Sequence, residues 1–244
     1  MLAEQEWTII PMIINIPLGA FGGPLRNGDM IGVANVVEYL RKTEDTETKF
    51  YLTPESIHSA EYCQKFYKFL LENTDYFSAT PGEKMLPWKN INLWDFRGIA
   101  GDVVKIKNTK LQEKKIVIFP LFNAPYNFYR NWPTKLFENI IHFYNQPEYK
   151  DYKKIICTED NVSAEGWETS KDFMTNIEHI MTSEIFIGGD TGTSHFVGAL
   201  EGGPNEIIYY YSGHGLLHTT PINALNGKGR IVMYWKDPEN SQWR

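Results

Sequence analysis

The residues best suited to chemistry lie in one stretch, residues 185–195, which reads Ile-Phe-Ile-Gly-Gly-Asp-Thr-Gly-Thr-Ser-His. Its three apolar residues predict a short buried strand, and the two glycines that follow allow the backbone to turn sharply. The polar residues from Asp190 onward then begin a predicted helix. A strand, a glycine turn and a helix start, in this order, direct several N–H groups and the positive end of a helix dipole at one place. This arrangement is suited to binding a diphosphate.

Five residues of this stretch are candidate ligand-binding residues, and each has a purely structural alternative. The backbone amides of Thr191, Gly192 and Thr193 are the expected phosphate donors. The two threonines are also ordinary helix-start residues, and Asp190 is a residue type that commonly holds a turn. We expect His195 to pack or hydrogen-bond in the wall of the site rather than to transfer a proton.

Bulk composition limits the class of protein. The chain has 244 residues, 42% of them hydrophobic, which is enough to bury one large or two small cores. The net charge of −6 argues against a general nucleic-acid binder, because neutralising phosphates requires clustered Lys and Arg, although a local basic groove is compatible with it. No apolar run is long enough to span a bilayer, and the N-terminus lacks the pattern of a signal peptide.

The two cysteines indicate a reducing environment. Cys63 falls on a helical pattern and Cys157 on a strand pattern, and neither has metal-ligand spacing. We therefore expect two buried, reduced thiols in a cytoplasmic protein.

Strands and helices alternate along the chain, most clearly in its second half. The predicted strands cover residues 7–17, 49–53, 116–119, 154–157, 185–187, 207–211 and 231–234. The predicted helices begin at Asn27 and just after Pro133, and cover residues 55–72, 171–181 and 193–200. Such alternation predicts an α/β fold with parallel sheets. We divide it into two Rossmann-like halves, residues 1–110 and 111–244, joined between Asp102 and Glu113.

Two further sets of residues follow predicted strands, where α/β sheets bind their ligands. The loop with Gly19, Gly22 and Gly23 follows the first strand and allows a ligand to approach the backbone closely. Glu159 and Asp160 follow the second strand of the second half. They are suited to holding ribose hydroxyls, as acidic residues do in dinucleotide-binding folds, and a solvated acidic loop is the equal alternative.

Three segments, in order, resemble the heptosyltransferase-type family of glycosyltransferases. The first is Gly28-Asp29, followed by an apolar helix that ends in Leu-Arg. The second is a strand and loop with Arg130 two residues before a Trp-Pro pair. The third and most specific is the Gly-Gly-Asp-Thr-Gly segment that begins at Gly188, with a histidine three residues after its end and an Ala-Leu pair closing the helix. The middle loop departs from the family, which usually has Pro-Gly and a lysine there, and the first half is shorter.

The resemblance implies the GT-B architecture, in which two Rossmann-like domains with parallel sheets face each other. It also implies that Asp29 is the base for the acceptor hydroxyl, that Arg130 binds phosphate oxygens and that Ser212, Gly213 and His214 line the cleft. Asp29 has an equal alternative, a favourable charge in the first turn of its helix. Arg130 has the alternative of an ordinary surface cation.

The expected activity is therefore sugar transfer from a nucleotide-diphosphate sugar, with inversion and without a metal or other cofactor. The acceptor expected from the resemblance is a saccharide or glycolipid. A hydroxymethylated DNA base is a second possibility, and it would require base flipping. Two other functions stay open: a nucleotide-sugar epimerase of the same fold, and a nucleotide-binding module without catalysis.

Overall fold

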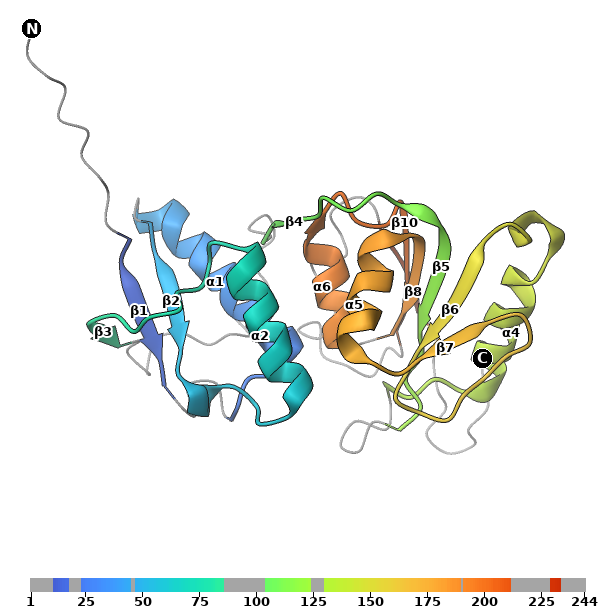
Figure 1. The fold of residues 1–244 in the computed structure, drawn as a ribbon, viewed down its shortest axis with the longest axis horizontal. Helices are drawn as coiled ribbons and strands as arrows, with labels where there is room; N and C mark the ends of the chain where they lie inside the picture. The colour runs from blue at the N-terminus through green and yellow to red at the C-terminus, as the bar shows by residue number, and fades with distance from the viewer. Residues whose placement is uncertain are drawn as a thin grey trace, which may run out of the picture. The chain divides into compact units, whose positions relative to one another are not determined.

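The computed structural model describes residues 11–17, 23–44, 47–85, 104–123, 130–189, 191–211 and 229–233. In these ranges the protein is a mixed α/β fold, and all of its paired strands are parallel (Figure 1). The chain divides into two compact units. Unit 1 comprises Met1–Arg26 and Gly32–Asp102, and unit 2 comprises Asn27–Ile31 and Val103–Arg244.

Unit 1 contains a three-stranded sheet in the order β2-β1-β3. Its elements along the chain are β1 (Ile13–Ile16), α1 (Asn27–Glu44), β2 (Lys49–Leu52), α2 (Glu61–Asn73) and β3 (Lys84–Met85). Only the first turn of α1, Asn27–Ile31, groups with unit 2. The helix α1 begins at Asn27, as the sequence predicts.

The second helix of unit 1 is shorter than the expected span of residues 55–72. Pro54–Ser56 form a separate 3-10 turn, and α2 begins only at Glu61. Between them, Ile57 has an extended backbone and pairs with Leu25, which lies just before α1. This pairing takes Ile57 out of any helix, and the hydrophobic period of the sequence does not reveal it.

Unit 2 is built on a six-stranded parallel sheet. Its strands are β5 (Glu113–Phe119), β6 (Lys153–Cys157), β7 (Glu168–Ser170), β8 (Ser183–Gly188), β10 (Glu206–Tyr211) and β11 (Gly229–Met233). Their order is β11-β10-β8-β5-β6-β7. Numbered along the chain, this is the order 6-5-4-1-2-3 of the doubly wound Rossmann sheet. A separate pair, β4 (Ile106–Lys107) and β9 (Leu200–Glu201), forms a small second sheet.

Helices cover both faces of the large sheet (Figure 1). On one face lies α4 (Thr134–Tyr144), and on the other lie α5 (Phe173–Thr182) and α6 (Gly192–Ala199). The α4 face has a continuous apolar core. Its buried members are Ile116, Ile118, Trp132, Phe137, Ile140, Tyr144, Ile156, Trp167, Ile185, Ile187 and Ile208. This core fixes the sheet rigidly under the loops that leave its carboxyl edge.

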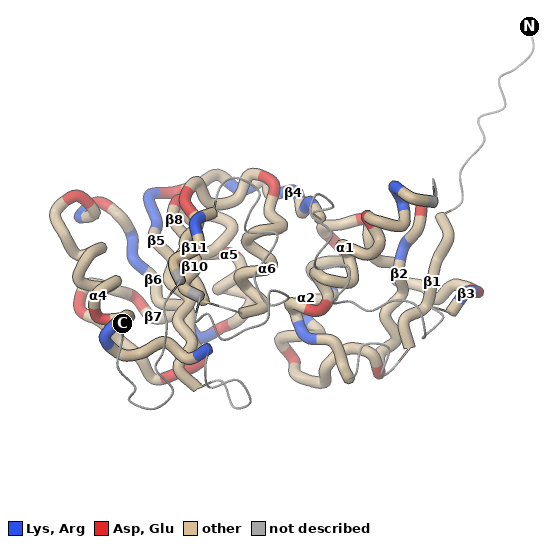
Figure 2. The backbone as a smooth tube through the Cα atoms, turned by 180° about the vertical axis from the view of Figure 1, so that it is seen from behind, with Lys and Arg blue, Asp and Glu red and all other residues tan. Residues whose placement is uncertain are grey.

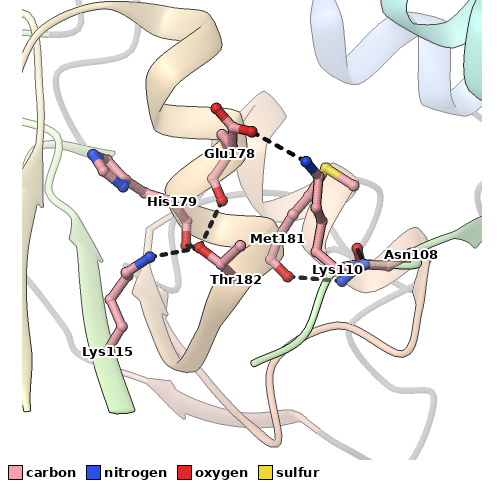
Figure 3. Close-up of polar contacts among 7 residues, drawn as sticks. All are labelled: Asn108, Lys110, Lys115, Glu178, His179, Met181 and Thr182. Carbon is pink, nitrogen blue, oxygen red and sulfur yellow. Dashed lines mark hydrogen bonds and ion pairs between the residues drawn. The ribbon is translucent and has the colours of Figure 1, made fainter. Parts of the chain in front are cut away.

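The opposite, amino end of the sheet is held by polar contacts (Figure 3). The buried ammonium of Lys115 donates to Thr182 Oγ1 at 2.6 Å and pairs with Glu113 at 2.9 Å. The amide of Asn108 donates to the carbonyl oxygen of Met181 at 2.7 Å. These bonds tie the chain that enters β5 to the end of α5, far along each strand from the carboxyl edge.

Charges of both signs are interspersed along the described backbone (Figure 2). Of the helices in the described ranges, none is both long enough and apolar enough to cross a membrane.

Candidate functional site

The order of the large sheet reverses between β5 and β8, and this point defines the candidate site. The two strands are neighbours, with Phe119 of β5 opposite Gly188 of β8 at their carboxyl ends. The connections on the two sides of this point leave in opposite directions, and α/β proteins of this strand order bind ligands outside the strand ends at such a point. The stretch that the sequence singles out therefore leaves the sheet at the point where the strand order reverses.

Gly188 and Gly189 form a corner that has no room for a side chain. A Cβ atom on Gly188 would lie 2.7 Å from the ring of Phe186 and 2.9 Å from Ser194 Oγ. A Cβ atom on Gly189 would lie 2.6 Å from Trp132 Nε1. Both residues are therefore glycine because neighbouring side chains occupy the space, which is a different reason from the sharp turn predicted from the sequence.

Hydrogen bonds shape the start of α6. Thr191 has an extended backbone and directly precedes the helix, and its amide donates to the carbonyl oxygen of Gly189 at 2.9 Å. Its hydroxyl lies 2.7 Å from that of Thr193. The amide of Thr191, which we expected to bind phosphate, is thus already used. The first-turn amides of Gly192 and Thr193 have no acceptor within the helix.

The first turn of α1 packs against the start of α6. A Cβ atom on Gly192 would lie 2.8 Å from the backbone nitrogen of Gly28 and 3.3 Å from Asn27 Cβ. A Cβ atom on Gly28 would lie 3.2 Å from both the Cα of Gly192 and the Cδ2 of His195. Asp29 belongs to this same turn of α1. Two helix N-termini therefore meet, and their positive dipole ends reinforce each other.

Two buried polar atoms beside these backbone groups have no hydrogen-bond partner in the described structure. They are Nε1 of Trp132 and Oδ1 of Asn27. Trp132 is 3% exposed and Asn27 is 7% exposed, so both residues are largely shielded from bulk solvent. Such atoms are costly in a folded protein, and a bound ligand, ion or water is one way to satisfy them.

A second polar contact joins the ends of β5 and β6. The amide of Asn123 donates to Asp160 Oδ1 at 2.6 Å, and the backbone nitrogen of Asp160 donates to Thr158 Oγ1 at 3.1 Å. Glu159 is exposed, and Asp160 is partly buried. Of the two acids predicted to hold a ribose, Asp160 is the one that is oriented by the loop after β5.

The other predicted residues are distributed as follows. Arg130 is half-buried and lies two residues before Trp132, which directly precedes Pro133, the N-cap residue of α4. Gly23 precedes α1, and a Cβ atom there would meet nothing within 4 Å. The remaining predicted residues lie outside the described ranges, and they are Gly19, Gly22, Asp190, Ser212, Gly213 and His214.

The structure adds Trp132, Asn27 and Asn123 to the predicted site residues. Trp132 belongs to the Trp-Pro pair that the resemblance already singled out, and Asn27 directly precedes the Gly28-Asp29 pair. Their positions in these motifs were the signal that could have identified both residues. Nothing in the sequence marks Asn123, because its role depends on the adjacency of β5 and β6.

The described residues include no group of three or more His, Cys, Asp or Glu side chains that could hold a metal ion. Comparisons of the chain with protein-family models, with curated proteins and with solved structures found no match.

Proposed function

We propose that the protein transfers a sugar from a nucleotide-diphosphate sugar to an acceptor hydroxyl. The observation that carries this proposal is the glycine corner and the α6 N-terminus at the point where the sheet order reverses. A diphosphate fits such a site because backbone N–H groups and two helix dipoles act on it together. The buried, unpartnered Nε1 of Trp132 adds a donor beside Gly189.

In the proposed reaction, the acceptor oxygen forms a bond to the anomeric carbon as the bond from that carbon to the diphosphate oxygen breaks. The electron pair of the broken bond stays on the diphosphate, where the amides of Gly192 and Thr193 and the guanidinium of Arg130 stabilise the growing charge. The acceptor proton passes to the carboxylate of Asp29. Attack from the face opposite the leaving group inverts the anomeric centre.

Ligand-dependent thermal stability tests the binding half of this proposal. We expect at least one of UDP, ADP, GDP and CDP to raise the melting temperature by about 5–10 °C at about one hundred times its Kd, because binding contributes about 2.7 kcal/mol under that condition. Inorganic sulfate at the same concentration is the control for a nonspecific anion effect. The absence of a shift with all four diphosphates would contradict the proposal.

Turnover tests the reaction. The corresponding nucleotide sugars are incubated with the protein, with and without a panel of saccharides, glycolipids and DNA containing hydroxymethylated bases. Release of the nucleoside diphosphate together with formation of a glycosylated acceptor supports sugar transfer. Isomerisation of the donor without any acceptor identifies an epimerase, and binding without consumption identifies a binding module.

A further inference from the structure

We infer that Tyr209 is a positioning residue for the proposed diphosphate site, and this inference rests on the proposed function. Tyr209 lies on β10 and is 1% exposed. Its hydroxyl donates to the carbonyl oxygen of Ser194, inside α6, at 2.7 Å. Because Tyr209 is buried and its hydroxyl bonds to α6, the residue acts through this helix.

Ser194 continues this connection toward the glycine corner. Its hydroxyl donates to the carbonyl oxygen of Gly189, and its backbone nitrogen donates to the carbonyl oxygen of Thr191 at 3.1 Å. The carbonyl oxygen of Gly189 also accepts from the backbone nitrogen of Thr191 at 2.9 Å. A continuous set of bonds therefore runs from the strand β10 through α6 to the glycine corner.

This connection matters because α6 is short. It has eight residues, so its N-terminal turn is not held in place by a long helix body. The ring of Tyr209 packs against that of Phe186 at a centroid distance of 6.4 Å, which fixes the ring on the sheet. The hydroxyl then determines where the amides of Gly192 and Thr193 lie relative to the strand ends. A displacement of a few tenths of an ångström would lengthen the proposed bonds to phosphate.

The Tyr209→Phe variant removes the hydroxyl alone and tests this role. Its matched control is Tyr67→Phe in unit 1, where a partly buried tyrosine hydroxyl donates to the carbonyl oxygen of Ser78 at 3.3 Å. The measurement is the Kd of each nucleoside, of each nucleoside diphosphate and of inorganic pyrophosphate. The informative quantity is the ratio of nucleoside Kd to diphosphate Kd, because a general loss of stability lowers both affinities.

We expect Tyr209→Phe to weaken pyrophosphate and diphosphate binding by about tenfold or more while nucleoside binding changes little. Tyr67→Phe should leave the ratio unchanged. An unchanged ratio in Tyr209→Phe would overturn the inference and leave the proposed function standing. If the unaltered protein binds neither pyrophosphate nor any nucleoside diphosphate, both fail together.

Should Tyr209→Phe fold poorly, Ser194→Ala interrupts the same connection at its other end. It removes the bond to the Gly189 carbonyl oxygen and keeps the tyrosine in place. The same drop in the ratio supports the inference, and an unchanged ratio with a folded Ser194→Ala protein contradicts it.

Discussion

Asp29 is an acidic residue in the first turn of α1, immediately after the glycine that contacts α6. A carboxylate in this position favours the helix dipole by about 0.3–1 kcal/mol, whether or not it also acts as a base. Turnover, and not stability, therefore separates the two roles. A base is required for transfer, and a favourable charge is not.

We expect Asp29→Asn to lower kcat by at least about 100-fold, because it removes the proton acceptor but keeps the shape of the side chain. Diphosphate binding should change little, and the free energy of unfolding should fall by no more than about 0.3–1 kcal/mol. Glu38→Gln on the same helix is the matched control, since the carboxylate of Glu38 pairs with Lys42 at a distance of 3.8 Å. Unchanged turnover in a folded Asp29→Asn protein would leave the residue with the dipole role alone.

A second prediction for a single side chain is that the carboxylate of Asp160 binds the ribose of the nucleotide. One of its oxygens accepts from Asn123, so its carboxylate is oriented before any ligand arrives. A carboxylate at the end of the second strand of a Rossmann sheet is placed to accept from ribose hydroxyls. Glu159 beside it is exposed and offers a natural comparison.

We expect the protein to bind ribonucleoside diphosphates about tenfold more tightly than their 2′-deoxy forms, because hydrogen bonds to charged groups contribute about 1.5–3 kcal/mol. Asp160→Asn should remove most of this preference, and Glu159→Gln should preserve it. Isothermal titration with paired ribose and deoxyribose ligands measures both. The reverse ranking of the two variants would assign the ribose to Glu159.

At the scale of the elements, the contact between the starts of α1 and α6 requires residues without a side chain at two positions. Gly28 and Gly192 approach through their backbones, and any Cβ atom on Gly192 would lie 2.8 Å from a backbone nitrogen. A backbone neighbour cannot rotate away as a flexible side chain can. One of the two helices would have to shift.

We expect Gly192→Ala to lower the free energy of unfolding by about 1–3 kcal/mol, as overpacking commonly does. Gly28→Ala should cost less, because its nearest neighbours would be 3.2 Å away. Thr134→Ala, at the exposed first residue of α4, is the control. Denaturant titration gives all three values, and equal stability of Gly192→Ala and the unaltered protein would show that the contact is not rigid.

Local patterns predict most elements of unit 2 and miss those that depend on tertiary pairing. The apolar runs of β5, β8 and β10 and the helical period of α4 are evident in the sequence because these segments face a buried core. β7 carries no such signal, since its residues are Glu, Thr and Ser and two of them are exposed. Its parallel pairing with β6 makes it a strand.

The candidate site is predictable to a similar degree. The run from Gly188 to His195 has a local signature, because strand, glycines and helix start are consecutive. The order of the strands in the sheet has no local signature in the sequence. The proximity of Trp132 to Gly189 and of Asn123 to Asp160 therefore cannot be predicted from the sequence. These contacts depend on which strands become neighbours.

At the scale of the whole molecule, we expect acid pH to lower the stability of the fold through His179, which lies near the amino end of the large sheet (Figure 3). Burial, followed by the charges of Lys115 and Lys153, lowers the pKa of His179 below its usual value of 6.5. The unfolded chain therefore takes up a proton at a higher pH than the folded chain. The contribution of neutral His179 to the free energy of unfolding is fully present above about pH 6.5. This contribution is lost as the pH falls toward the pKa of His179 in the folded state.

We expect the melting temperature to fall between about pH 7.5 and about pH 5, and the fall to be smaller in His179→Gln than in the unaltered protein. His142→Gln, on the surface of α4, is the control. Differential scanning calorimetry across this range measures the difference between the curves. Parallel curves for His179→Gln and the unaltered protein would remove His179 as a cause.

The two thiols have a practical consequence. Cys63 lies in α2 of unit 1 and Cys157 lies in β6 of unit 2, and both are 0% exposed. A thiol reagent reaches each one only when its own unit opens. Mass spectrometry of the labelled peptides would therefore time the opening of each unit separately, in the protein as it is, without any engineered probe.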